Sequence, residues 1–340
     1  MTITRRMTLA TAVAASLAAP AITRAQAKHQ WRVQGYLPAS FTEMEMFKAW
    51  GEELKGKSGG QIEIELLPVG AVVPVTDTLD AMRSGVLAGH FTGSPYFAGK
   101  DPAFAVIGDT LAAYENAAQR DRWFEEGGGT ALARKLYARF GAHYVGNVYT
   151  PEEWLPAKKP LYKLEDLRGI KIRAPQGTVS ELFRRAGAGV VVLPFTEVFN
   201  ALDSGVIDAS DAAWIDLNDK LGMHKVVKYE IYARHSMGAI EFVVAQPRWN
   251  ALSAEQKRLV ETELRGFSRK MKEHYDRVEI GAMQRVQAQG VTLIRWAPEE
   301  YVKVRQILLA IWKDMSAQSA SVKEIVDSHL AFMKKLGLSS

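Results

Sequence analysis

The pattern of a strand, a helix and a second strand is contained in Val190-Val-Val-Leu-Pro-Phe-Thr-Glu-Val-Phe-Asn-Ala-Leu-Asp-Ser-Gly-Val-Ile207. The apolar run at 190–193 predicts a strand that Pro194 ends. Residues 196–204 predict a helix, and Gly205 stands where a helix stop is expected. This order is typical of α/β proteins, in which a helix connects two strands of one sheet.

A second stretch, earlier in the chain, has the same pattern. Asp80-Ala-Met-Arg-Ser-Gly-Val-Leu87 matches Asn200-Ala-Leu-Asp-Ser-Gly-Val-Ile207, and the alternating segment 62–67 precedes it as a strand. A helix that ends at a glycine and is followed by a strand is common in α/β proteins. Two such units about 120 residues apart nevertheless predict two similar lobes, each a mostly parallel sheet flanked by helices.

The C-terminal third predicts mainly helices. Ser253-Ala-Glu-Gln256 is a capping box that opens a helical pattern as far as Gln289. Such a helix, if unbroken, would be about 55 Å long, so we expect it to span both lobes or to kink near Gly266 or Gly281. A strand at 291–296 and helices at 298–315 and 321–335 follow. Because these last helices are rich in apolar residues, they either pack back on the chain or form a homodimer through the C-terminal helices.

The first 27 residues have the features of a secretory signal peptide. Arg5-Arg6 precede an apolar stretch at 9–22, and Ala25-Gln-Ala27 forms a cleavage site. The apolar run of about 14 residues is shorter than the roughly 20 that a membrane span needs. We expect cleavage after Ala27 and export to the periplasm by the Sec or the twin-arginine (Tat) route.

Composition narrows the class of protein. The 340 residues include 43 Lys and Arg, 38 Asp and Glu, 47% hydrophobic residues and no cysteine, which is typical of a globular chain without disulfides or thiolate metal sites. Since the signal segment holds three arginines and no acid, its removal lowers the net charge from +5 to about +2. We therefore expect no nucleic-acid partner, which would need a clustered basic face. No GxSxG, HExxH or P-loop motif is present, so we expect a protein that is not an enzyme.

Arg173 is the strongest candidate for a binding residue. The segment Ile170-Lys-Ile-Arg-Ala-Pro175 predicts a strand that ends at the proline, and Gly177 precedes a helix at 179–185. Arg173 would then lie at the carboxyl end of a strand beside a helix N-terminus, where free N–H groups favour an anion. Its guanidinium can hold a carboxylate through two parallel hydrogen bonds. The alternative is a strand arginine exposed to solvent.

Leu167-Arg-Gly-Ile-Lys-Ile-Arg-Ala-Pro175 and the segment 193–208 resemble the hallmark segments of the periplasmic solute receptors of TRAP transporters, the DctP family. The resemblance extends over essentially the whole mature chain and is closest to the branch that binds 2-oxo and 2-hydroxy monocarboxylates. It implies a type II-like, two-lobe periplasmic binding protein that closes around a carboxylate and delivers it to the TRAP membrane permease. It also implies that Arg173 is the carboxylate clamp.

The resemblance and the pattern of elements together suggest domain limits. We expect the first lobe in 28–150 and 238–280, and the second in 151–237 and 281–300. The C-terminal helices would occupy 301–340. Since no Pro- or Ser-rich linker separates the lobes, the chain should cross between them more than once.

In the resembling branch the ligand also contacts a cation, held by an acidic residue, the next residue's carbonyl and a glutamine. Asp211 and Ala212 match the first two positions, whereas Tyr149 replaces the glutamine. A bound Na or Ca ion therefore loses one of its expected ligands here. Glu241 is a candidate substitute acid, its alternative role being that of an ordinary residue at a strand start.

Aromatic side chains complete the expected pocket, since aromatic walls around one charged anchor are usual for small-molecule sites. Near the expected cleft, at strand ends or in loops, lie Tyr36, Tyr96, Tyr149, Trp154 and Trp214. Asn147 and Asp211 could add polar contacts. If no cation is bound, an aromatic or branched carboxylate is the alternative ligand. An exported lyase or hydrolase acting on such acids is the competing class, for which Asp211 or Glu241 would be the base.

Overall fold

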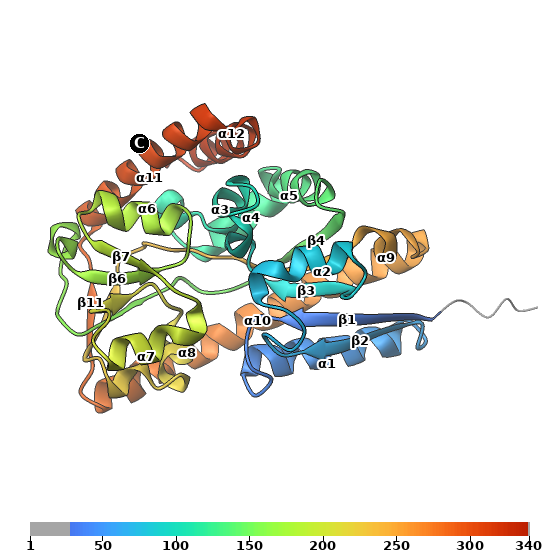
Figure 1. The fold of residues 1–340 in the computed structure, drawn as a ribbon, viewed down its shortest axis with the longest axis horizontal. Helices are drawn as coiled ribbons and strands as arrows, with labels where there is room; N and C mark the ends of the chain where they lie inside the picture. The colour runs from blue at the N-terminus through green and yellow to red at the C-terminus, as the bar shows by residue number, and fades with distance from the viewer. Residues whose placement is uncertain (1–27, 339–340) are drawn as a thin grey trace, which may run out of the picture.

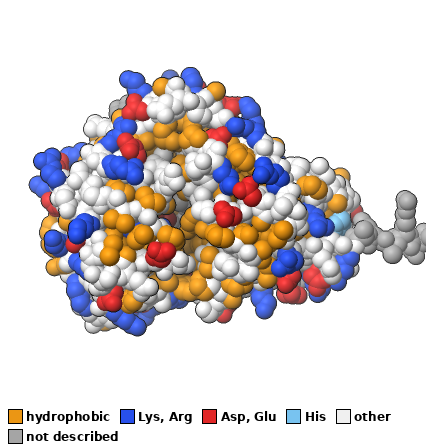
Figure 2. Space-filling view, viewed as in Figure 1, with side chains coloured by type: hydrophobic (Ala, Val, Ile, Leu, Met, Phe, Trp, Pro, Cys, Tyr) orange, Lys and Arg blue, Asp and Glu red, His pale blue; other side chains and the backbone are white. Residues whose placement is uncertain are grey.

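The structure, a computed structural model, describes residues 28–338, which form two sheets side by side with helices on their faces (Figure 1). The expected signal peptide, residues 1–27, lies outside the described residues. Within 28–338 no helix has both the length and the apolar character needed to cross a membrane. On the face shown in Figure 2, acidic and basic side chains are interspersed, with no large basic patch.

The first sheet has five strands in the order β2-β1-β3-β10-β4. They are β1 (His29–Gly35), β2 (Ile62–Leu67), β3 (Gly89–Thr92), β4 (Ala142–Val148) and β10 (Ile240–Ala245). Between β1 and β2 the helix α1 (Thr42–Lys57) buries its apolar face on the sheet, where Phe47 stacks on Phe91 with 4.0 Å between ring centroids. The strand expected at 62–67 is present with these limits as β2.

The second sheet has six strands in the order β11-β9-β5-β8-β6-β7. They are β5 (Leu155–Ala157), β6 (Lys171–Ala174), β7 (Gly189–Val192), β8 (Ala209–Ser210), β9 (Tyr229–Tyr232) and β11 (Thr292–Arg295). The strand expected at 206–207 begins later, at Ala209, and Val206 is exposed. The helix before it, α7 (Val198–Asp203), follows a 3₁₀ turn at Phe195–Glu197.

Each sheet is mixed, because one of its strands runs against all the others. These strands are β5 and β10, and each pairs antiparallel with both of its neighbours. Both come directly after a segment where the chain passes from one sheet to the other, at 149–154 and at 233–239. The prediction of an α/β fold with two mostly parallel sheets is thus confirmed, with the exceptions at the crossings.

The two crossing segments are tied together by a buried arginine. Nη1 of Arg120 donates to the carbonyl of Gly238 (2.5 Å), and Nη2 donates to that of Thr150 (3.1 Å). Next to them Arg234 has a left-handed backbone (φ 50°), an uncommon conformation for a residue with a side chain. Its guanidinium contacts Glu115 and lies 4.2 Å from the ring centroid of Tyr301, so this strained point is firmly anchored.

The helix α10 (Ala254–Ala288) joins both halves without a break, and the capping box at Ser253 and Gln256 is formed. Its 35 residues correspond to about 52 Å. The first part packs Val260, Leu264 and Phe267 into the core of the first sheet, and Val286 packs beside the second sheet. The helix therefore spans both lobes, and the alternative of a kink at Gly266 or Gly281 is not needed (Figure 1).

The C-terminal helices α11 (Pro298–Gln318) and α12 (Ala320–Lys335) pack back on the chain. Trp312 is fully buried, and the His329 ring lies between Trp123 and Trp312, at 3.7 and 5.0 Å from their centroids. Leu330, by contrast, is 42% exposed. Most of the apolar residues that suggested a homodimer are thus used within the chain, and the dimer stays a prediction without support from the structure.

The remaining helices are short and lie over the two sheets. They are α2 (Thr78–Arg83), α3 (Ala103–Gly108), α4 (Ala117–Glu126), α5 (Gly129–Ala138), α6 (Thr178–Arg185), α8 (Ile215–Lys220) and α9 (Gln246–Asn250). Single 3₁₀ turns occur at Val75–Asp77, Ser94–Phe97, Leu111–Ala113, Leu164–Leu167 and Met223–Lys225. The strands use the same segments as the expected lobes, although the domain limits themselves stay a prediction.

If the C-terminal helices belong to the core, Trp312→Ala should lower the free energy of unfolding by about 3–5 kcal/mol, because it removes a fully buried indole and leaves a cavity. The measurement is urea denaturation followed by fluorescence and circular dichroism. Leu330→Ala on the outer side of α12 is the control and should change stability by about 0.5 kcal/mol or less. A loss below about 1 kcal/mol for Trp312→Ala would show that the helices dock only loosely.

Candidate functional site

A cavity lies between the two sheets, and both crossing segments line it. Including the part that opens to solvent, it has about 710 Å³ of space, within the range of small-molecule sites. Its lining consists of Tyr36, Gly93, Pro95, Tyr96, Gly108, Asp109, Thr150, Glu153, Arg173, Pro175, Phe195, Asp211, Ala212, Ala213, Trp214, Leu217, Gly238, Ala239 and Ile240. Both lobes therefore contribute to the surface that a ligand would touch.

Arg173 lies at the end of β6, and its side chain is only 3% exposed. Nε donates to the carbonyl of Leu193 and Nη1 to the carbonyl of Asp211, both at 2.9 Å. No described residue accepts a hydrogen bond from Nη2. The Phe195 ring centroid lies 5.9 Å from the guanidinium carbon. Two main-chain carbonyls thus fix the plane of the guanidinium, and part of its donor capacity is left for the cavity.

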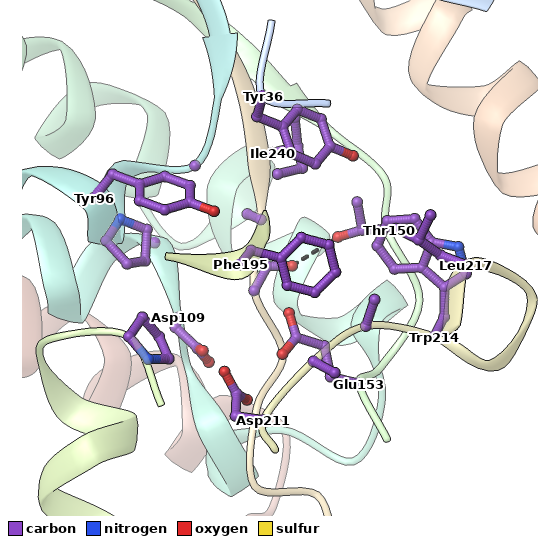
Figure 3. A pocket seen from close by; sticks show the side chains of 18 of the residues that line it. Tyr36, Tyr96, Asp109, Thr150, Glu153, Phe195, Asp211, Trp214, Leu217 and Ile240 are labelled. Atoms are coloured by element: carbon purple, nitrogen blue, oxygen red, sulfur yellow. Dashed lines mark hydrogen bonds between the residues drawn. The ribbon is translucent and has the colours of Figure 1, made fainter. Parts of the chain in front are cut away.

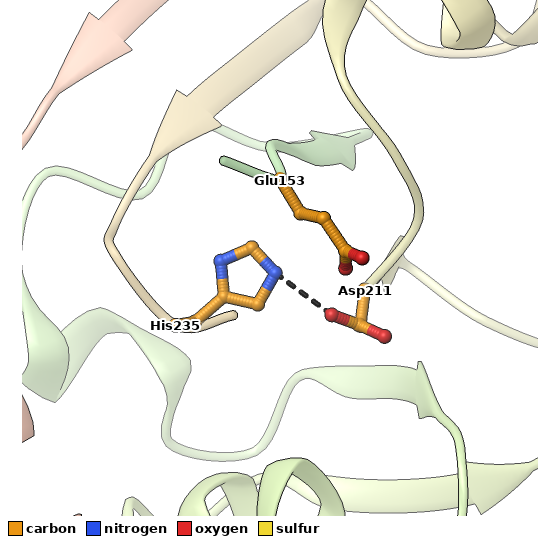
Figure 4. Close-up of side chains that lie close together, drawn as sticks. All are labelled: Glu153, Asp211 and His235. Atoms are coloured by element: carbon orange, nitrogen blue, oxygen red, sulfur yellow. Dashed lines mark ion pairs between the residues drawn. The ribbon is translucent and has the colours of Figure 1, made fainter. Parts of the chain in front are cut away.

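Asp211 follows β8, and its main-chain N–H donates to the carbonyl of Arg173 (2.8 Å). Its carboxylate is buried between two cationic or potentially cationic side chains. Oδ2 lies 3.6 Å from Nη1 of Arg173, and Oδ1 lies 2.9 Å from Nε2 of His235 (Figure 4). The imidazole does not make an aligned hydrogen bond to Oδ1, which stays without a donor.

Two further carboxyl groups face the same space. Glu153, from the first crossing, has an oxygen within 4.8 Å of both Asp211 and His235. Burial raises the pKa of Glu153 well above its usual value, and the Asp211 and Asp109 carboxylates raise it further. Figure 3 shows the carboxyl groups of Asp109, Asp211 and Glu153 on one side of the cavity, with Tyr36 and Tyr96 on the other.

Asp109 holds the second crossing in place. Oδ1 accepts hydrogen bonds from the main-chain N–H groups of Leu111 (3.0 Å) and Met237 (2.9 Å), and Oδ2 accepts one from the Ser236 hydroxyl (2.6 Å). Burial raises the pKa of Asp109 to about 6, and the nearby Asp211 carboxylate contributes to this rise. The hydrogen bond from Ser236 acts in the opposite direction and lowers the pKa.

The structure brings most of the expected site residues together. Tyr36, Tyr96, Arg173, Asp211, Ala212 and Trp214 all line the cavity. The alternative for Arg173, a strand arginine in solvent, is wrong, because the side chain is buried. Tyr96 and Trp214 are on opposite sides of the cavity in Figure 3, as expected of aromatic walls.

Four of the expected residues lie outside the cavity. Nδ2 of Asn147 donates to Asp121 (3.0 Å), and Glu241 accepts a hydrogen bond from the Tyr137 hydroxyl. These two are cross-strand neighbours on β4 and β10, so both point to the sheet face that α4 and α5 cover. Tyr149 lies on the outer side of the crossing, with its ring 6.3 Å from Tyr275 and 5.5 Å from Nζ of Lys272. Trp154 also lies outside, stacked at 4.9 Å on the Arg295 guanidinium.

Sequence reasoning missed Asp109, Glu153 and His235. Glu153 and His235 lie within the two segments where the chain passes between the lobes, and Asp109 forms a bridge with Gly238 of the second segment. The usable signal was an acidic or imidazole side chain directly beside a crossing, since the crossings of a two-lobe fold must border the cleft. The pair Glu152-Glu153 before Trp154 has this property.

The predicted cation ligands do not assemble. Glu241 is buried elsewhere, where burial raises its pKa to about 8. Glu153, Asp211 and His235 offer two carboxylates and an imidazole within 4.8 Å, whereas Ca²⁺ prefers six to eight oxygens. The guanidinium of Arg173 also lies 3.6 Å from Asp211, where it would repel a metal ion. This donor set does not fit Na⁺ or Ca²⁺ well.

Two mixed sheets that meet at a cavity, joined by two crossings and one long helix, define a two-lobe receptor fold for small solutes. Over residues 34–319 the sequence matches the family described as bacterial extracellular solute-binding protein, family 7 (DctP), and the chain belongs to this family. It is a TRAP periplasmic solute-binding protein, and the family acts in transport as extracytoplasmic receptors for TRAP permeases rather than as enzymes.

Known relatives cover nearly the whole chain. The monocarboxylate 2-oxoacid-binding periplasmic protein of Nostoc sp. is 28% identical over 314 residues, which is 90% of this chain and 85% of that protein. A TRAP periplasmic solute-binding protein from Rhodobacter sphaeroides, in an apo open structure, is 32% identical with a TM-score of 0.76, covering 91% and 99% of the two chains. One from Bordetella bronchiseptica, with copurified calcium and picolinate, is 23% identical with a TM-score of 0.83 over 92% and 93%.

The pKa of Asp109 predicts a pH dependence of stability. An unfolded aspartate titrates near 3.9, so the folded chain binds a proton more tightly at this site and loses stability as the pH rises from about 4 to about 6. The free energy of unfolding of the wild type minus that of Asp109→Asn should therefore fall over this window, by up to about 3 kcal/mol. Urea denaturation at several pH values measures it. A difference that stays flat or rises would contradict the environment assigned to Asp109.

Proposed function

We propose that this chain captures an organic acid in the periplasm, holds its carboxylate with Arg173, and delivers it unchanged to a TRAP membrane permease. The observation that carries the proposal is the Arg173 guanidinium, which is buried at the cavity wall and whose Nη2 has no acceptor among residues 28–338. Asp211 Oδ2, 3.6 Å from Nη1, balances part of the charge, but a buried donor without an acceptor is costly. A ligand carboxylate supplies the acceptor for Nη2.

The guanidinium is held ready for the ligand. Because the carbonyls of Leu193 and Asp211 fix two of its nitrogens, little side-chain entropy is lost when the carboxylate arrives. The aromatic walls at Tyr36, Tyr96 and Trp214 then cover the rest of the ligand. Closure of the lobes would exclude water and strengthen the ion pair.

Several finer features belong to the same proposal. The mature chain would begin after Ala27. It would act without bound Na⁺ or Ca²⁺, since Glu241 and Tyr149 both lie outside the cavity. No chemical step is needed, and recovery of an acid unchanged after incubation would distinguish this receptor from an exported lyase or hydrolase. The relative from Nostoc, named for binding monocarboxylate 2-oxoacids, favours a monocarboxylate here. The aromatic walls also suit a branched or aromatic acid.

Removing the clamp should abolish most of the affinity. Arg173→Ala should weaken the tightest binder of a carboxylate panel by about 30- to several-thousand-fold, corresponding to about 2–5 kcal/mol, because it leaves the ligand's charge buried without a partner. Arg173→Lys should recover only part of this, since an ammonium lacks the planar fork. Isothermal titration calorimetry measures both.

Arg184→Ala is the matched control, because it removes an arginine from the exposed side of α6. Its affinity should stay within about threefold of the wild type. A loss below about threefold for Arg173→Ala itself would rule out the clamp.

A further inference from the structure

The charges that line the cavity do not balance once a ligand is bound. The titratable groups on the lining are Arg173 and three acids, Asp109, Glu153 and Asp211, with the two tyrosines opposite. His235 stands behind Asp211, and Arg120 points away to the carbonyls of the crossings. If Arg173 takes the ligand's carboxylate, the acidic side of the cavity has no cation of comparable strength facing it.

Asp211 lies between two different subsites. Oδ2 faces the guanidinium at 3.6 Å, whereas Oδ1 faces Glu153 and His235 and is buried without an aligned hydrogen-bond donor. A buried acceptor without a donor costs about 1–3 kcal/mol, and more when it is charged. Asp211 is 3% exposed and lines the cavity, so a donor that enters between its carboxylate and Glu153 would satisfy Oδ1.

Resting on the function proposed above, we propose that the ligand is a zwitterion, an amino or imino acid whose protonated nitrogen binds between Asp211 Oδ1 and Glu153 while its carboxylate binds Arg173. Asp211 touches both subsites, so the two charges of the ligand must be close together. That spacing is characteristic of a 2-amino acid, in which the nitrogen and the carboxylate are attached to the same carbon.

An ammonium suits this subsite better than the alternatives. It carries three N–H donors for the oxygens of Asp211 and Glu153, and its positive charge pairs with Asp211 and favours loss of the proton that burial keeps on Glu153. A 2-hydroxyl offers one donor and no charge. A 2-oxo group is an acceptor only, so it can accept a hydrogen bond from a neutral Glu153 but leaves the Asp211 carboxylate without a donor. The expected order of affinity is amino, then hydroxy, then oxo acid.

The test uses sets of acids that differ only at the second carbon. Three frames cover the open question of ligand size: alanine, lactate and pyruvate; leucine, 2-hydroxy-4-methylpentanoate and 4-methyl-2-oxopentanoate; phenylalanine, phenyllactate and phenylpyruvate. Each is titrated calorimetrically into ligand-free protein, with excess EDTA and again with added CaCl₂. In at least one frame the amino acid should bind at least about tenfold more tightly than both counterparts, with EDTA present.

Two variants then test the subsite. Glu153→Gln removes one carboxylate and should lower the ratio of amino-acid to oxo-acid affinity by about tenfold or more. Glu152→Gln is the matched control: its side chain accepts from the main chain of Ala117 on the other side of the crossing and does not line the cavity. It should leave the ratio within about threefold.

The outcomes separate this inference from the function it rests on. If an oxo or hydroxy acid binds in an Arg173-dependent manner and no amino acid exceeds it tenfold, the receptor function stands and the zwitterion is overturned. Binding of an oxo acid only when CaCl₂ is present would place a metal ion in this subsite and also overturn the proposal. Binding of none of the nine acids would count against both.

Discussion

The site is organised around the ionised guanidinium of Arg173, which the fold buries away from water. Strand order makes this feasible, because β6 lies between β8 and β7, and the chain segments that leave these two neighbours supply the carbonyls of Asp211 and Leu193. Parallel strands end at the same edge of a sheet, so the two carbonyls reach Arg173 from both sides. The carbonyls occupy Nε and Nη1 without neutralising the charge, and the Asp211 carboxylate lies 3.6 Å from Nη1, so Nη2 is the nitrogen left to an anion.

The elements of the fold could largely be predicted from the sequence, because strong periodicity and glycine or proline stops mark them. Arg173 could be predicted for the same reason, since Pro175 fixes where its strand ends. The sequence did not allow us to predict which face of a sheet an individual strand side chain points to. Asn147 and Glu241 face away from the cavity, and a shift of one residue in pairing would have reversed this. Pairing is a tertiary property that no local pattern specifies.

The acids on one side of the cavity could not be predicted from the sequence, for a different reason. Asp109 and Glu153 lie near irregular segments where neither a period of two nor a period of 3.6 applies. Their partners are distant in the sequence: Asp109 accepts from Ser236 and Met237, and Glu153 lies beside Asp211. The family resemblance of the sequence implies a carboxylate clamp at Arg173, but it does not point to these acids.

The long helix α10 has a mechanical consequence. Its side chains are part of the hydrophobic cores of both halves, at Phe267 on one side and Val286 on the other, so neither half can slide along it without unpacking. An α-helix bends and twists more easily than it stretches, because stretching breaks every backbone hydrogen bond in its path. Any motion between the halves would therefore be a rotation and not a sliding movement. Such a rotation would bring the same residues together at the cavity each time.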